Sequence, residues 1–297
     1  MLFVTYNIQF GCGRDKKIDL ARIARTVAAA DVILLQEVER HWRPPNGDQA
    51  EQLARLLPGY RWVHAPSIDL DGSSVAADGA VDNRRRQLGL MILSRTPILS
   101  TRRLTLDKMP VRGKIADDAV LLEAVIRPGK EALRVYNTHL SYLSQRQRLR
   151  QVEQIRQFVQ SAPQRGPVVV GEGIDPQVFH ADWVDLEAED LPPMPSAALM
   201  MGDFNMMPRS PEYESLVGAL DPVYGRLVEA DRFADVLTLA GLGENEGITF
   251  PASGGKQAKR IDHGFVTPDL APRVKRAWID DKADGSDHQP VWVELAP

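Results

Sequence analysis

The sequence predicts a layered α/β fold. Short β-type runs of apolar residues recur along the whole 297-residue chain, and each is too short to form a helix. Amphipathic helical patterns lie between them, but helices and strands do not alternate strictly. This mixed order favours a layered α/β protein over a doubly wound parallel sheet.

The predicted elements are separated by turn-forming segments such as "PPNG" at Pro44–Gly47. The predicted strands are Leu2–Tyr6, Val32–Gln36, Tyr60–His64, Leu88–Leu93, Val120–Ile126, Leu133–Asn137, Ala198–Met201, Ile261–Val266 and Val291–Leu295. The predicted helices are Asp19–Ala29, Asp48–Leu57, Ser144–Gln160 and Ala230–Ala240. Since no internal repeat or Gly/Ser-rich linker divides the sequence, we expect a single domain over residues 1–297.

One segment before the strand at Ala198 differs in composition from the rest. Residues 166–208 contain no Lys or Arg, while acidic residues and prolines gather in them. We therefore expect an acidic, proline-containing insertion at about residues 171–197. It is either a surface insertion or a flap beside the active site. The run "PVVVGEG" just before it is a candidate extra edge strand.

Composition and charge exclude several classes of protein. With 43% hydrophobic and 26% charged residues, the chain is neither disordered nor fibrous. A net charge of -4 argues against wholesale nucleic-acid binding, although it leaves room for a local basic cleft. Cys12 is the only cysteine, which excludes an intramolecular disulfide and a thiolate zinc cluster. No apolar stretch reaches the roughly 18 residues of a membrane span, and no leader precedes the first strand, so we expect a cytoplasmic protein.

Polar side chains close several of the predicted apolar strands. Taken singly, each is common as a turn former, a helix cap or a structural histidine. Together they predict loops that converge on one edge, and buried carboxylates without neighbouring cations indicate a metal ion. These residues are Asn7, Glu37, Asn137, His139, Asp203, Asn205, Asp262, Asp287 and His288.

The motifs "TYNIQ", "QEV", "NTHLS", "GDFN", "RIDH" and "SDHQPV", in this order, resemble those of a known family. It is the endonuclease/exonuclease/phosphatase superfamily of deoxyribonuclease-like, metal-dependent phosphohydrolases. The resemblance spans Val4 to Val293. It implies a four-layered α/β sandwich, in which two mostly antiparallel sheets pack face to face with helices outside. It also implies hydrolysis of a phosphoester bond by a water that attacks in line.

The resemblance implies metal-binding and water-activating roles for individual residues. Glu37 is expected to be the main carboxylate ligand of a divalent cation, helped by Asn7 and Asp287. Such hard oxygen ligands suit Mg²⁺ or Mn²⁺ rather than zinc. Asp203 is expected to orient or deprotonate the attacking water, and Asn205 to hold a phosphoryl oxygen.

The histidines receive roles in the same way. His288 is expected to act as a base or as a phosphate contact, with Asp262 fixing its tautomer. A protonated His139 is expected to stabilise charge in the transition state. Members that resemble pancreatic deoxyribonuclease or the sphingomyelinases carry His at this position, whereas abasic-site endonucleases carry Tyr, which disfavours DNA repair. Some relatives place an acidic partner for this His ahead of the "LSR" strand, but the segment here reads "RRRQLGLMILSR".

Four residues are candidates for substrate binding: Asn137, Arg86, Phe250 and Arg260. Arg86 ends a triple-arginine run, which is either a substrate contact or a surface charge run. Phe250 offers a stacking face for a base, a sugar or a lipid headgroup, next to Lys259 and Arg260. Because the net acidity disfavours a polyanion, we expect a small phosphoester substrate. The alternatives are a nuclease acting on DNA or RNA and a non-catalytic binding protein on the same fold.

Overall fold

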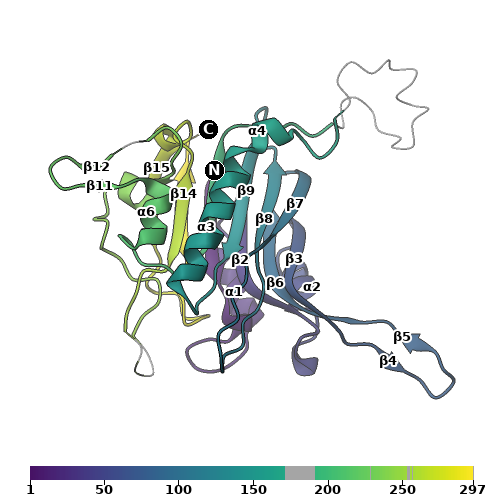
Figure 1. The fold of residues 1–297 in the computed structure, drawn as a ribbon. Coiled ribbons are helices and arrows are strands. Elements are labelled where there is room, and N and C mark those ends of the chain that lie inside the picture. The colour runs from purple at the N-terminus through teal and green to yellow at the C-terminus, as the bar shows by residue number, and fades with distance from the viewer. Residues whose placement is uncertain (171–190, 228, 253–254, 256, 297) are drawn as a thin grey trace, which may run out of the picture.

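Two six-stranded sheets stand face to face at the centre of the protein, with helices on their outer sides (Figure 1). This computed structural model describes residues 1–170, 191–227, 229–252, 255 and 257–296. The expected four-layered sandwich of two sheets flanked by helices is confirmed.

Each sheet contains one parallel strand pair, β1 with β2 and β9 with β10, and its other pairs are antiparallel. The first sheet has the order β15 (Val274–Ile279), β16 (Val291–Leu295), β1 (Leu2–Asn7), β2 (Val32–Arg40), β6 (Arg85–Ser94) and β3 (Arg61–Asp71). The second has the order β13 (Ala234–Asp235), β14 (Asp262–Val266), β10 (Ala198–Asp203), β9 (Leu133–His139), β8 (Ala119–Ile126) and β7 (Ile98–Leu106). Two small hairpins are formed by β4 (Ser74–Val75) with β5 (Val81–Asp82) and by β11 (Leu220–Asp221) with β12 (Gly225–Arg226).

The helices begin where side chains cap them. Asp19 and Asp48 accept hydrogen bonds from backbone N–H groups in the first turns of α1 (Leu20–Val27) and α2 (Gln49–Leu56), which pack on the first sheet. The second sheet is covered by α3 (Gln145–Gln160) and α6 (Pro211–Val217). Shorter helices are α4 (Ala162–Arg165) and α7 (Val236–Leu239), with 3-10 turns at Gln9–Gly11, Pro44–Asn46 and Ala271–Arg273. Among the described helices, none has the length and apolar character needed to cross a membrane.

The core lies in three apolar layers that the two sheets separate. Along β2, Leu34 belongs to the layer between the sheets, whereas Ile33 and Leu35 belong to the layer under α1 and α2. Every residue of β8 is buried. Because both faces of these strands are covered, apolar residues follow one another directly at residues 32–35 and 119–122 rather than alternating with polar ones.

Some elements differ from those expected. The edge strands β7 and β15 were not predicted, because exposed polar residues interrupt their sequences. The helix predicted at Ala230–Ala240 is wrong: Asp235 belongs to β13 and caps only the short α7. In "PVVVGEG", the described residues 167–170 form no strand. Residues 171–190 of the predicted insertion lie outside the described residues, and residues 191–197 form neither helix nor strand.

Candidate active site

Three predicted residues form a row across neighbouring strands of the second sheet. Asp203, at the end of β10, is paired with His139 at the end of β9 on one side. On its other side it is paired with Asp262, the first residue of β14. Strand register therefore places these three side chains side by side.

Glu37 is directed by an irregularity of the first sheet. It lies inside β2, where the pairing with β6 shifts register between Leu35 and Val38, and its φ is 61°. Such a bulge redirects a side chain, and a left-handed backbone at a residue other than glycine costs on the order of 1–3 kcal/mol. Asn205 has a left-handed φ of 49° two residues after the end of β10. The strained backbone of Glu37 is thus held by the surrounding sheet, whereas Asn205 is a residue type that adopts the left-handed region readily.

Asp203 is a buried carboxylate surrounded by donors. Its Oδ2 accepts a hydrogen bond from Nδ2 of Asn7 at 3.0 Å and lies 3.4 Å from Nε2 of His139 and 3.7 Å from Nε2 of His288. Its Oδ1 accepts from the backbone N–H of Asn205 at 2.9 Å. The structure thus gives His139 an acidic partner from β10, in place of one ahead of the "LSR" strand.

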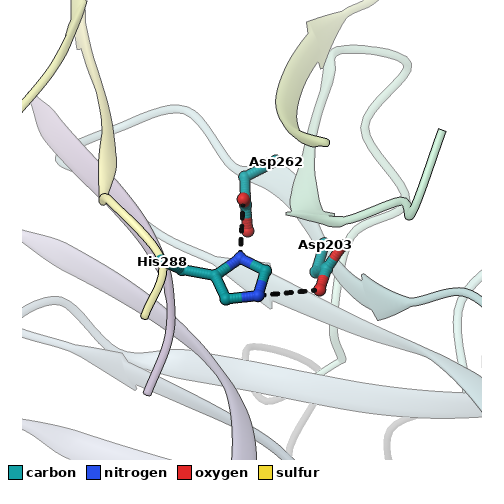
Figure 2. A group of neighbouring side chains, drawn as sticks. All are labelled: Asp203, Asp262 and His288. Carbon is teal, nitrogen blue, oxygen red and sulfur yellow. Dashed lines mark hydrogen bonds and ion pairs between the residues drawn. The ribbon is translucent and has the colours of Figure 1, made fainter. Parts of the chain in front are cut away.

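Asp262 and His288 form a buried pair beside Asp203 (Figure 2). Nδ1 of His288 lies 2.8 Å from Oδ2 of Asp262, so its Nε2 faces Asp203. Burial raises the pKa of Asp262, against the opposing effect of the His288 charge. Burial by itself lowers the pKa of His288, but the charges of Asp262, Asp203 and Asp287 outweigh it and raise that pKa. The pair therefore keeps its proton on the imidazole.

The oxygen ligands expected for a divalent cation lie in the same site. Oε1 of Glu37 accepts a hydrogen bond from Nδ2 of Asn7 at 3.1 Å, and Oδ2 of Asp287 accepts one from Nε2 of Gln9 at 2.9 Å. Oδ1 of Asn7 accepts from the backbone N–H of Gln9 at 3.1 Å. Asn7 thus presents its amide N–H groups to Glu37 and Asp203 in this structure, and its expected role as a metal ligand stays a prediction. Glu37 and Asp287 both line the same cavity, and their carboxylates are hard oxygen donors of the type that Mg²⁺ and Mn²⁺ prefer.

Asp203, Asp262 and His288 also lie close enough together to be considered as metal ligands, with one ligand atom of each within 4.8 Å of the others. A metal-bound imidazole needs a neutral nitrogen with a free lone pair. In His288, Nδ1 is engaged by Asp262, and three carboxylates favour the protonated ring. In this structure the three side chains form one hydrogen-bonded and ion-paired network, with Nδ1 of His288 toward Asp262 and Nε2 toward Asp203.

A cavity of about 770 Å³ connects these groups. Asn7 and Asp262 lie behind its wall and touch residues that line it. The predicted residues that line it are Glu37, His139, Asp203, Asn205, Phe250, Asp287 and His288. The ring of Phe250 meets the imidazole of His288 edge to face, with 5.0 Å between centroids.

The other candidate substrate contacts lie elsewhere. Asn137 is fully buried between the sheets, where its Nδ2 donates to the carbonyls of Leu35 and Met91. The guanidinium of Arg260 is buried in an ion pair with Asp235 at 2.8 Å. Neither side chain is exposed to a substrate, so both predictions are wrong.

Arg86 lies outside the cavity at an exposed position. Its guanidinium lies 5.0 Å from the ring centre of Trp42 and donates to the Trp42 carbonyl. It is absent from the lining of the cavity. The reading of Arg86 as part of a surface charge run fits this placement.

Several cavity residues were not predicted. Gln9 and Phe10 follow Asn7 with left-handed φ values of 44° and 59°, and Tyr142 follows the "NTHLS" motif. Nothing in these residue types marks a ligand. Their only sequence signal is their position directly after predicted site residues.

Residues 4–288 match the Endonuclease/Exonuclease/phosphatase family. The chain belongs to this family. A comparison with curated proteins gave no match.

Solved structures of the endonuclease/exonuclease/phosphatase family share the fold. A member from Beutenbergia cavernae is 21% identical with a TM-score of 0.61, over 100% of this chain and 72% of that one. A mannosyl-6-phosphatase from Bacteroides thetaiotaomicron is 17% identical with a TM-score of 0.59, over 100% of both chains. A humanized D. rerio TDP2 is 18% identical with a TM-score of 0.54, over 100% of this chain and 99% of that one. At such low identities these likenesses concern the fold alone.

Proposed function

We propose that this protein is a divalent-metal-dependent hydrolase of phosphoester bonds. The observation that carries the proposal is the setting of Asp203, whose carboxylate has Asn7, His139 and His288 around it. Glu37 and Asp287 line the same cavity. The site thus combines a positioned base, imidazole donors and hard oxygen ligands, which hydrolysis of an anionic ester requires.

Glu37 and Asp287 would hold the cation, with Asn7 and Gln9 fixing the orientation of their carboxylates. Hard oxygen donors of this kind suit Mg²⁺ or Mn²⁺. When bound, the cation supplies positive charge to the phosphoryl oxygens.

Asp203 would orient the attacking water and accept its proton, because its Oδ2 faces the cavity and both histidines. His288 would donate its Nε2–H to a phosphoryl oxygen. The raised pKa of His288, caused by the surrounding carboxylates against the effect of burial, supports this role over that of a general base.

His139 would also donate to the ester and stabilise developing charge. Nδ2 of Asn205 donates to the carbonyl of Leu140 at 2.9 Å. An amide nitrogen carries two hydrogens, so the second remains for a phosphoryl oxygen. Asn205 would thereby help to hold the phosphate.

A small phosphoester is our preferred substrate. The net charge of -4 disfavours a long polyanion, and one structural relative is named a mannosyl-6-phosphatase. A nuclease remains the second candidate, because Phe250 and Lys259 line the cavity and suit a stacked base and a second phosphate. A non-catalytic binding protein is the third. The cytoplasmic location stays a prediction from the sequence.

The test is hydrolysis of an aryl phosphomonoester and an aryl phosphodiester with Mg²⁺ or Mn²⁺, with and without a chelator. Asp203→Ala and His288→Ala should each lower the rate by at least ~10²-fold. Asp231→Ala and His41→Ala, at exposed or half-exposed positions away from the cavity lining, serve as matched controls. Activity that is indifferent to the chelator and to both site variants would overturn the proposal. Single-stranded DNA, duplex DNA and RNA in the same assay distinguish a nuclease.

A further inference from the structure

A smaller cavity of about 140 Å³ adjoins the candidate active site. The two cavities share Phe10, Glu37, His139 and Tyr142 in their walls. Asp203, by contrast, lines only the larger cavity. The smaller cavity, here called the side cavity, is thus reached from Asp203 by passing Glu37 and His139.

In-line displacement predicts on which side of the phosphorus the leaving group lies. The leaving oxygen departs on the side of the phosphorus opposite the attacking water. If Asp203 places the water, the leaving group lies toward Glu37 and His139, and beyond them toward the side cavity. His139 stands at the junction, since it lines both cavities, and its Nε2 lies 3.4 Å from Oδ2 of Asp203.

Two aromatic rings flank the junction. Phe10 is held in place by Arg43, whose guanidinium lies 3.9 Å from the centre of its ring. The hydroxyl of Tyr142 donates to the carbonyl of Ile115 at 3.2 Å, which ties this side chain to the segment that carries Asp117. Aromatic faces of this kind pack against the C–H faces of a ring-shaped ligand.

The remaining wall is apolar at its base and acidic at its rim. Leu90 and Val120 supply apolar surface, and the carboxylates of Asp117 and Asp118 also line the cavity. Asp118 is paired with Lys108 at 2.6 Å, whereas Asp117 is exposed. Carboxylates accept hydrogen bonds from hydroxyl groups and repel a second phosphate.

The volume limits what fits. At about 140 Å³ the side cavity is much smaller than the adjoining cavity of about 770 Å³. Its size favours a small group over a base pair or a lipid tail.

We propose that the side cavity binds the leaving group of the substrate, and that Phe10, Tyr142 and Asp117 select an uncharged, hydroxyl-bearing ring such as a monosaccharide. The proposal rests on the phosphoester hydrolase function above. It assigns specificity to residues outside the set that performs the chemistry.

The test compares a hexose 6-phosphate with the matching hexose 1,6-bisphosphate, whose second phosphate would enter the side cavity. We expect the native enzyme to prefer the monophosphate in kcat/KM, and Asp117→Lys to reduce that preference about tenfold. Asp78→Lys, at an exposed carboxylate on the β4–β5 hairpin, is the matched control and should leave it unchanged. Tyr142→Leu should raise KM for the hexose phosphate but not for glycerol phosphate, and Tyr224→Leu, at a ring that is 84% exposed, is its control.

Binding of the same two sugar phosphates is also titrated calorimetrically in the presence of a chelator, so that a readout exists without turnover. If no ester is hydrolysed but Asp117→Lys still removes the preference in binding, the hydrolase function fails and the subsite stands. If esters are hydrolysed but Asp117→Lys and Tyr142→Leu behave like their controls in both assays, the subsite proposal is overturned and the hydrolase function stands.

Discussion

Asp262 and His288 come from different sheets and meet at 2.8 Å, Oδ2 to Nδ1. Asp262 opens β14 in the second sheet, and His288 lies in the loop that precedes β16 in the first. The pair therefore joins the two sheets at the candidate active site. Its geometry depends on how the sheets pack, and it fixes which nitrogen of His288 faces Asp203.

Asp262→Asn should lower hydrolysis by ~10²- to 10⁴-fold, because the imidazolium loses the carboxylate that orients it and raises its pKa. The measurement is kcat/KM against pH. The fall in kcat/KM that follows deprotonation of His288 should occur at a lower pH in the variant than in the native enzyme. Asp281→Asn, at an exposed position in the loop after β15, is the control. An unchanged pH profile would contradict the assigned pairing.

Glu37→Gln should weaken divalent cation binding by at least about tenfold, because a neutral amide replaces a charged ligand. The measurement is the rise in melting temperature with added Mn²⁺, since a ligand that binds only the folded state stabilises it. Glu131→Gln, at a side chain that is 82% exposed, should keep the native response. A full Mn²⁺ response in Glu37→Gln would remove Glu37 from the ligand set.

Gly202→Ala should reduce the free energy of unfolding by about 1–3 kcal/mol. A Cβ at this position would lie 2.0 Å from the carbonyl oxygen of Thr138, so β9 and β10 would have to separate beside Asp203. Denaturant unfolding measures the change. Gly59→Ala is the matched control, since its Cβ would meet nothing within 4 Å. Equal stability of the two variants would refute the close strand approach.

Acid should destabilise the fold through His263. Burial lowers its pKa from 6.5 to about 4, and its Nε2 lies 2.9 Å from the carbonyl of Met206. Below pH 6.5 His263 becomes protonated in the unfolded chain but stays neutral in the native state. The free energy of unfolding is therefore highest above pH 6.5 and falls as the pH drops toward 4. The difference of pKa corresponds to about 3 kcal/mol.

Urea unfolding at several pH values measures this loss, and His263→Phe isolates it. The variant lacks the titrating group but keeps an aromatic ring stacked near Phe265. Between pH 6.5 and pH 4 the free energy of unfolding should decrease in both proteins. The decrease in His263→Phe should be about 3 kcal/mol smaller than the decrease in the native protein. Parallel curves for the two proteins would show that His263 does not couple to folding.

Arg260→Ala should destabilise the fold by about 3–5 kcal/mol, because it leaves the buried Asp235 without its cation. Its effect on KM should be no larger than that of Arg86→Ala, which removes an exposed contact with Trp42. Thermal unfolding and steady-state kinetics on both variants separate these outcomes. A selective rise in KM with intact stability for Arg260→Ala would restore its role as a substrate contact.

The strands that carry the site were readable from the sequence because both of their faces are buried, which requires continuous apolar runs. The polar residues that end these runs at Asn7, His139 and Asp203 stood out against that background. Family motifs added the expected roles. The edge strand β7 was not predicted, because one of its faces is exposed and carries polar residues that interrupt the apolar pattern.

Tertiary structure alone decided what surrounds those residues. The bulge at Glu37 and the left-handed turn at Phe10 follow from strand pairing and packing, and no local propensity favours either conformation. Arg260 and Asn137 stand next to site motifs in the sequence, yet Asp235 and the facing sheet bury them. The sequence by itself determined which residue types end the strands. Packing of the two sheets determined which of them meet at the cavity, because that contact joins segments far apart in the chain.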